Sequence, residues 1–246
     1  KIQSGRFTGT PIETRAIVAS FDPNMKLLTI WDTTQIGHPL STLIQDTIAL
    51  PDLKVHVNSQ RVGGGFGQKW AFYPEEVLIP LLSISTQRPV KWVETRREHM
   101  AGTVHAREQS HVIEAAVRKD GTILGIKDRI TANVGAAYPT GGLASIVTTG
   151  MFVPGAYKIP SYEGEVLGVV TNKTPYGAHR GFGKSEACFV IERLVDIIAE
   201  RLELDPTEVR FRNFIPPEAF PYISVTGPRY DSGNYAKALR KALDLA

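Results

Sequence analysis

The chain has almost no cysteine, because Cys188 is the only one in 246 residues. One thiol excludes an internal disulfide, and it excludes a zinc or iron–sulfur site built from several cysteines. Redox chemistry in this chain would therefore need an organic or organometallic cofactor. The six histidines show no metal-ligand spacing, and we expect His105 and His111 to occupy exposed polar positions.

A strong charge bias and long apolar runs are also missing. The 28 lysines and arginines nearly balance 25 aspartates and glutamates, which gives a net charge of +3, and the basic residues are dispersed. Nucleic-acid-binding proteins usually gather basic residues on one face, so this class is disfavoured. No stretch has the length of a membrane span, and the start does not resemble a signal peptide, so we expect a cytoplasmic protein.

What is present is the composition of a folded protein, 42% hydrophobic and 22% charged. We expect one lobe over residues 1–246, divisible into subregions 1–100 and 101–246. Ser232 is expected to cap a last helix, and the chain stops within its helical pattern at Ala246. We therefore expect the chain to be part of something longer.

Hydrophobic periodicity predicts interleaved strands and helices, which is an α+β fold with mixed β-hairpins. Turn residues at 22–24 and 119–121 predict two of the hairpins. The segment Gly135–Gly155 has no clear period, and we expect a loop or irregular structure there. The predicted strands are Arg15–Phe21, Lys26–Trp31, Leu53–Val57, Val90–Glu94, Glu108–Arg118, Thr122–Asn133 and Glu165–Thr171. The predicted helices are Leu40–Leu50, Tyr73–Ile84, Ser185–Leu202 and one that begins at Asp205.

Two glycine-rich segments are the most informative feature. They are Arg61–Lys69 and Tyr176–Lys184, and each holds a phenylalanine between glycines, Phe66 and Phe182. Their central parts, Gly63–Lys69 and Ala178–Gly183, are called the first and the second glycine loop. Glycine lets a ligand approach the main chain, and a following helix adds partial positive charge. We therefore expect both loops to direct N–H donors at one electron-rich ligand, with the aromatic rings as an apolar wall.

Neither loop carries a nucleotide motif. Lys69 is followed by Trp70 where a P-loop needs serine or threonine, and Gln68 stands where the last glycine of Gly-x-Gly-x-x-Gly would be. A nucleotide-binding regulatory domain is therefore disfavoured. For each loop taken alone, a tight strand-to-helix turn without any ligand is the alternative interpretation.

Six segments, in order and with similar separations, resemble a known family across nearly the whole chain. The family is the large, molybdenum-binding subunit of the molybdenum hydroxylases, which includes xanthine dehydrogenases, aldehyde oxidases and carbon monoxide dehydrogenases. The matching segments are Thr10–Arg15, Asp32–Gln35, Gly63–Lys69, Tyr157–Pro160, Ala178–Gly183 and Asp205–Asn213. The resemblance implies the fold of the first molybdopterin-binding domain of the xanthine dehydrogenase type.

The resemblance also implies the chemistry. Its cofactor is molybdopterin with molybdenum, often as the cytosine dinucleotide in bacteria, and the protein supplies no direct metal ligand. An aldehyde or N-heterocycle is hydroxylated with water as the oxygen donor, and electrons pass to iron–sulfur clusters and FAD on partner chains. The implied partners are the remaining half of the large subunit, an iron–sulfur subunit and an FAD subunit.

In the first half of the site, Gln35 matches the glutamine whose amide hydrogen-bonds an oxygen ligand of molybdenum. Gly65, Phe66 and Gly67 match the loop beside the metal, and the Gly67 N–H is expected to donate to an oxo or pterin group. The alternative for Gln35 is a polar residue that ends a strand.

In the second half, Arg180 matches the arginine whose main-chain N–H approaches the ligands of molybdenum, with Gly181 beside it. Phe182 matches an aromatic residue that flattens the substrate pocket, and ordinary core packing is its alternative. His179 could line the pocket, or its side chain could point away.

Three positions depart from particular members of the family. Purine-oxidising members carry a glutamate at the position of Trp70 and an arginine at that of Thr148. Copper-containing carbon monoxide dehydrogenases carry a cysteine where this chain has Gly181. Purines would lose two orienting contacts, so an aldehyde or a less polar heterocycle fits better, and carbon monoxide is disfavoured.

The general base of the family is a glutamate in a segment far downstream, and nothing after Gly183 supplies it. We expect Glu75 and Glu76 to be exposed in the first turn of a helix instead. The chain alone should be almost inactive, because general-base catalysis contributes roughly 10²–10⁴-fold. The leading hypothesis is therefore the first half of a molybdenum hydroxylase large subunit, either as a fragment or as one chain of a gene-split enzyme. The alternative is a non-catalytic scaffold or assembly subunit that keeps the fold.

Overall fold

The computed structural model describes residues 1–59, 61–136 and 142–246. It confirms the α+β prediction, because helices are interleaved with two mixed sheets. The strands are β1 (Ile2–Ser4), β2 (Ala16–Asp22), β3 (Leu27–Asp32), β4 (Lys54–Asn58), β5 (Val90–Val93), β6 (Gln109–Val117), β7 (Ile123–Gly135), β8 (Tyr162–Val170), β9 (Tyr222–Ile223) and β10 (Arg229–Tyr230). The helices are α1 (Gly37–Ile48), α2 (Glu75–Thr86), α3 (Arg96–Gly102), α4 (Leu143–Phe152), α5 (Lys184–Leu202), α6 (Pro206–Asn213) and α7 (Tyr235–Leu243), with 3-10 turns at Gln68–Trp70 and Pro217–Ala219.

The first sheet has the strand order β4-β3-β2-β5. The predicted hairpin forms β2 and β3, which pair antiparallel from Ile17 opposite Asp32 to Asp22 opposite Leu27. Because side chains alternate along a strand, one face of this hairpin collects the apolar residues. That face packs against α1 and α2 around Leu28, Ile30 and Ile44, all fully buried.

The second sheet has the order β1-β6-β7-β8, and the predicted hairpin at 119–121 joins β6 to β7. Strand β8 runs parallel to β7. Helix α5 presents the apolar face that its periodicity predicts, with Val190, Leu194 and Ile198 buried in the core against this sheet. A separate hydrophobic cluster therefore supports each sheet.

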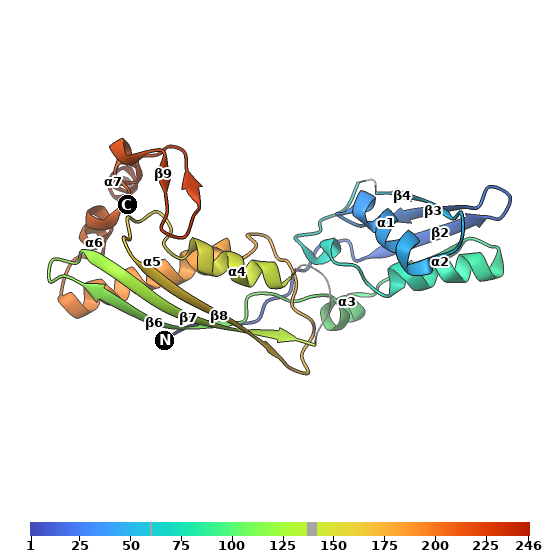
Figure 1. Ribbon diagram of the computed structural model, residues 1–246, viewed down its shortest axis with the longest axis horizontal. Coiled ribbons are helices and arrows are strands. Elements are labelled where there is room, and N and C mark those ends of the chain that lie inside the picture. Colours follow the sequence, from blue (N-terminus) through green and yellow to red (C-terminus); the bar gives the residue numbers. More distant parts are fainter. Residues whose placement is uncertain (60, 137–141) are drawn as a thin grey trace.

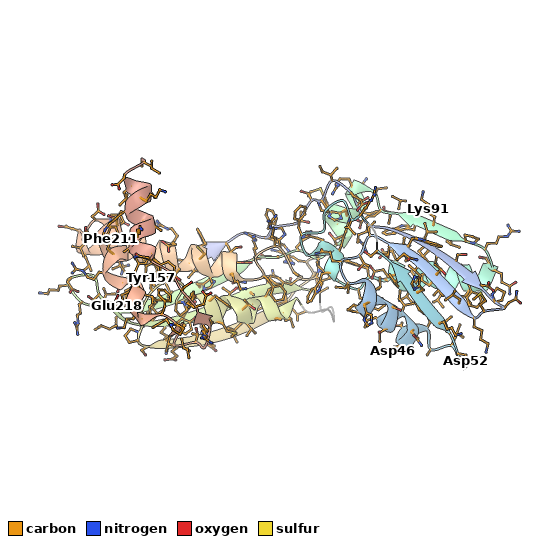
Figure 2. The ribbon with its side chains drawn as sticks, turned by 90° about the horizontal axis from the view of Figure 1, so that it is seen from above. Asp46, Asp52, Lys91, Tyr157, Phe211 and Glu218 are labelled. Atoms are coloured by element: carbon orange, nitrogen blue, oxygen red, sulfur yellow. The ribbon has the colours of Figure 1, made fainter. Side chains whose placement is uncertain are left out.

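The two sheets lie at opposite ends of an elongated molecule, and the glycine-loop region lies between them (Figure 1). Figure 2 marks one end by Asp46, Asp52 and Lys91 and the other by Tyr157 and Phe211. The short strand β1 belongs to the sheet of β6 to β8, although it opens the chain. The division into subregions 1–100 and 101–246 stays a prediction.

Two predictions of local structure are wrong. Residues 143–152, expected as a loop or irregular segment, form the helix α4, while residues 137–141 of that prediction lie outside the described part. Helix α4 has no charged residue and buries small polar ones such as Ser145 and Thr149, so it shows no amphipathic period. The last helix is capped by Asn234, whose side chain accepts from the Lys237 N–H, and not by Ser232.

In the part of the chain that the structure describes, no helix combines the length and the hydropathy that crossing a membrane requires.

A buried polar network lies between the first sheet and α3. Arg15 donates to Glu94 through Nε at 3.0 Å and Nη2 at 2.7 Å, and its guanidinium lies 3.7 Å from the centre of the Tyr73 ring. His99 contacts Glu94 through Nδ1 at 2.8 Å and the Gly9 carbonyl through Nε2 at 2.9 Å. A carbonyl can only accept, so His99 is the donor, and the network fixes the backbone at Gly9.

Glu76 belongs to the same interior, so the expectation that it is exposed is wrong. Glu76 is only 5% exposed to solvent, and its carboxyl oxygen accepts a hydrogen bond from the Tyr73 N–H at 2.9 Å. Burial, followed by the neighbouring Asp32, raises the pKa of Glu76 to about 8. Burial likewise raises the pKa of Asp32 to about 7 against the opposing charge of Arg15. The sequence predicts that a glutamate in the first turn of a helix is exposed to solvent. Here, other segments of the chain cover Glu76.

We expect the protein to lose stability between about pH 5 and pH 8 because of Glu76. The unfolded side chain, with its ordinary pKa of 4.5, is ionised across this window, while the folded one stays protonated up to about pH 8. Glu76→Gln keeps an acceptor for the Tyr73 N–H and removes the titration. In urea unfolding, its stability relative to the wild type should rise from pH 5 to pH 8 by on the order of 2 kcal/mol. The exposed carboxylate variant Asp52→Asn should show no such trend, and parallel pH profiles for Glu76→Gln and wild type would contradict the assignment.

Candidate functional site

Both glycine loops open onto one pocket of about 630 Å³. All seven residues predicted for the site line it. The described lining residues are Gln35, Gly65, Phe66, Gly67, Trp70, Ala178, His179, Arg180, Gly181 and Phe182. Residues that lie far apart in the sequence are thus brought together at the middle of the molecule (Figure 1). Their individual roles remain predictions.

The two loops share the same backbone conformation at their aromatic residue. Phe66 has a φ of 52° and the following Gly67 a φ of 104°, while Phe182 has 48° and Gly183 has 90°. A bulky side chain rarely adopts the left-handed region, and such positions cluster at binding sites. Each Phe-Gly pair reverses the chain just before a helical turn and so exposes its ring, with Phe66 40% exposed.

The loops contact each other directly through the main chain. The Arg180 N–H donates to the Phe66 carbonyl at 2.9 Å. At Gly67 a Cβ would overlap the Ala178 carbonyl, so only glycine allows this approach. On the far side, Arg107 Nη2 donates to the Arg180 carbonyl at 3.1 Å and holds the second loop in place.

Gln35 is fixed against the first loop in one orientation. Its N–H donates to the Lys69 carbonyl at 2.8 Å, and its side-chain Oε1 accepts from the Gly67 N–H at 3.0 Å. Because an N–H can only donate, Oε1 must face Gly67 and the amide Nε2 must face away. Nε2 donates to none of the described residues, and the Gln35 side chain is exposed at the pocket. A Cβ on Gly65 would overlap this amide, which explains glycine there.

The donors differ from those that the sequence suggested. The N–H groups of Gly67 and Arg180, expected to face a cofactor, are both used inside the protein. Those of Gly65, Phe66 and Gly181 donate to no described residue. The glycines at 65 and 67 serve contacts between protein segments, so glycine content alone predicted the loops but not which amides stay free.

Aromatic side chains form the apolar wall of the pocket. Trp70 and Phe182 pack edge to face with ring centres 5.8 Å apart, so Phe182 lies at the pocket rather than in a core. His179 also lines the pocket, and its ring packs on that of Phe7 with the ring centres 4.6 Å apart. Burial, and after it the charge of Arg107, lowers the pKa of His179, which favours a neutral imidazole at neutral pH.

Sequence reasoning missed Ala178 as a contact and gave Trp70 only as a departure. The signal for Trp70 was its position directly after the first loop. Thr148 is not among the described lining residues, because it lies on α4 with its hydroxyl donating to the Ala144 carbonyl at 2.9 Å.

The buried histidines correct another expectation. His111 is fully buried, and its Nδ1 lies 2.8 Å from Asp128 Oδ2, whereas an exposed position was expected. Its neighbours in β6 alternate between the core and the outer face, and this alternation is the signal that would have placed His111 inside. Within residues 1–59, 61–136 and 142–246, no three His, Cys, Asp or Glu side chains gather to hold a metal ion.

Comparison with known proteins identifies the fold. Residues 1–214 match the molybdopterin cofactor-binding domain. The chain is 42% identical over 243 residues to the carbon monoxide dehydrogenase large chain of Hydrogenophaga pseudoflava, covering 95% of this chain and 30% of that protein. It is 37% identical over 252 residues to the 6-hydroxypseudooxynicotine dehydrogenase complex subunit gamma of Paenarthrobacter nicotinovorans. This match covers 100% of this chain and 32% of that protein.

Among solved structures, quinoline 2-oxidoreductase from Pseudomonas putida 86 superposes with a TM-score of 0.92 at 34% identity, covering 99% of this chain and 31% of that one. The chain therefore spans less than a third of the length of these relatives. On the match over residues 1–214, the chain belongs to the molybdopterin cofactor-binding domain family.

Proposed function

We propose that the pocket receives the metal end of a molybdopterin cofactor, and that the chain is part of a molybdenum-dependent hydroxylase of aldehydes or N-heterocycles. The observation that carries the proposal is the convergence of both glycine loops and Gln35 on one pocket. A chance pair of strand-to-helix turns would not place its two left-handed phenylalanines around a common space.

The residues present fit such a cofactor. An oxygen-rich metal group needs hydrogen-bond donors, and the pocket offers the Gln35 amide together with the N–H groups of Gly65, Phe66 and Gly181. Arg180 is exposed, forms no ion pair with the described residues and adds a positive charge, and no described lining residue is acidic. This donor set suits a ligand that carries its own metal and negative charge.

Each lining group would have a distinct task. When bound, the cofactor supplies a two-electron oxidation with water as the source of oxygen. Gln35 would donate its Nε2 hydrogen to an oxygen of the metal group, and the Gly67 N–H would keep the amide in that orientation. Trp70 and Phe182 would hold a flat substrate and exclude water from the reacting face.

An aldehyde or an N-heterocycle less polar than a purine is favoured as substrate, and carbon monoxide is disfavoured. The edge-to-face pair of Trp70 and Phe182 suits an aromatic ring with few polar groups, and one similar structure is named for quinoline. Neither of the charged residues of purine-oxidising members is present. A cysteine at Gly181 would be strained by its φ of 105° and would overlap the Ser185 hydroxyl.

The remaining parts of the activity would come from elsewhere. We assign the general base to the remaining half of the large subunit, and electron transfer to iron–sulfur and FAD subunits. The cofactor would be the cytosine dinucleotide form, in a cytoplasmic complex. Co-expression of this chain with those parts, followed by metal and pterin analysis, should give about one molybdenum and one pterin per chain. A stable complex that lacks both would instead favour a scaffold.

Removing the Gln35 amide should impair chemistry more than cofactor retention. We expect Gln35→Ala and Gln35→Glu to lower kcat of the assembled complex about 10²-fold, as loss of one oriented donor does. The glutamate variant keeps an acceptor for the Gly67 N–H but has no N–H to give. Steady-state kinetics with quinoline gives kcat of both variants. Gln45→Ala, on the exposed face of α1, is the control. Wild-type kcat in Gln35→Glu would contradict the role.

Adding a methyl group at Gly67 should separate the loops. Gly67→Ala places a side chain at φ 104° against the Ala178 carbonyl, and we expect a stability loss of about 2 kcal/mol or more, with lower molybdenum content. Gly102→Ala is the matched control, because a Cβ there meets nothing within 4 Å. Urea unfolding and metal analysis check both variants. Equal stability of the two variants would show that the loop contact is not tight.

A further inference from the structure

A single carboxylate oxygen touches both ends of the first glycine loop. Glu13 Oε2 accepts from the Gly63 N–H at 2.7 Å and from Lys69 Nζ at 2.7 Å. The Glu13 N–H also donates to the Gly63 carbonyl at 3.4 Å. Gly63 must be glycine for this, because a Cβ would lie 2.6 Å from the Glu13 Cβ. We call Glu13, Gly63 and Lys69 the loop clip.

Lys69 makes the clip strong, because it is a buried cation. Its side chain is 1% exposed, and Glu13 is its ion-pair partner among the described residues. A buried ammonium group without a partner costs several kcal/mol, so the pair is held together. Burial alone would raise the pKa of Glu13, but the Lys69 hydrogen bond, the Gly63 N–H and the Lys69 charge outweigh it and keep the pKa below its usual value.

The clip is also connected to Gln35. The Lys69 carbonyl accepts from the Gln35 N–H at 2.8 Å and from the Thr34 hydroxyl at 3.3 Å. Lys69 thus holds Glu13 with its side chain and the Gln35 backbone with its main chain. A shift at Lys69 would move the segment that presents the Gln35 amide to the pocket.

We propose that Glu13 is a positioning residue, which closes the first glycine loop and, through Lys69, fixes the backbone of Gln35. Glu13 is not among the described residues of the pocket lining, so it acts through the loop and not on a ligand. The inference deepens the proposed function and rests on it for its link to the cofactor. Its structural part concerns this chain alone.

Hydrogen–deuterium exchange of the purified chain tests that structural part. Glu13→Ala should raise exchange of the Gly63–Lys69 amides and of the Gln35 N–H by about tenfold or more. Lys69→Met removes the buried charge and keeps the length, so it should release the Gln35 N–H and leave the Gly63 N–H protected. Glu13→Gln, which keeps the size and an acceptor, should give a smaller increase.

Asp52→Ala is the matched control, because it breaks the exposed ion pair between Asp52 and Lys26. This pair lies at the outer end of the first sheet, far from the loop (Figure 2). It should leave the loop unchanged. Exchange in Glu13→Ala that equals the wild type, or an equal increase in Asp52→Ala, would overturn the clip.

Metal content of the co-expressed complex tests the link to function separately. Wild type should contain molybdenum, and Glu13→Ala should contain several-fold less, whereas Asp52→Ala should match the wild type. Molybdenum missing from the wild-type complex would refute the proposed function, while full molybdenum in Glu13→Ala despite faster loop exchange would refute the positioning role.

Discussion

The contact between the two glycine loops is the constraint on which the pocket depends. One loop follows β4 of the first sheet, and the other precedes α5, which packs against the second sheet, so neither sheet alone can form the cavity. The contact is main chain to main chain, with the Arg180 N–H on the Phe66 carbonyl and Gly67 against Ala178. Backbone contacts tolerate exchange of many side chains but not the addition of a Cβ at the point of approach.

Buried contacts around the first loop hold its strained turn, and one set of them reaches Gly9, which packs against Gln68 of the loop. Arg15, Glu94 and His99 form a chain of buried hydrogen bonds that ends at the Gly9 carbonyl. Glu13, two residues before Arg15, ties the loop itself to Lys69. A left-handed φ costs of order 1–3 kcal/mol per residue, and the hydrogen bonds of a fully paired network around it can offset this free energy. The site is thus rigid where it meets the protein and open where a ligand would enter.

Sequence predicted the local elements well and the neighbourhood of single groups poorly. The turn at 22–24 and the period of α5 specify structure by themselves, because spacing and turn chemistry act over a few residues. Helix α4 was missed since it has no charged face: it buries Ser145 and Thr149 and leaves apolar residues such as Val147 exposed. Glu76 and the Gly67 N–H were misjudged because their surroundings come from distant segments. The convergence of the loops was predictable only because two similar motifs suggested a shared ligand.

The separation of the two loops along the chain has a consequence for biosynthesis. A growing polypeptide can complete the sheet of β2 to β5 as soon as residue 93 has left the ribosome, yet the Phe66 carbonyl meets its partner only after Arg180 emerges. Contacts of such long range are made late in folding, since their closure entropy must be offset by structure already formed. A ligand held by both loops can therefore bind only after Arg180 has emerged and the two loops have come together.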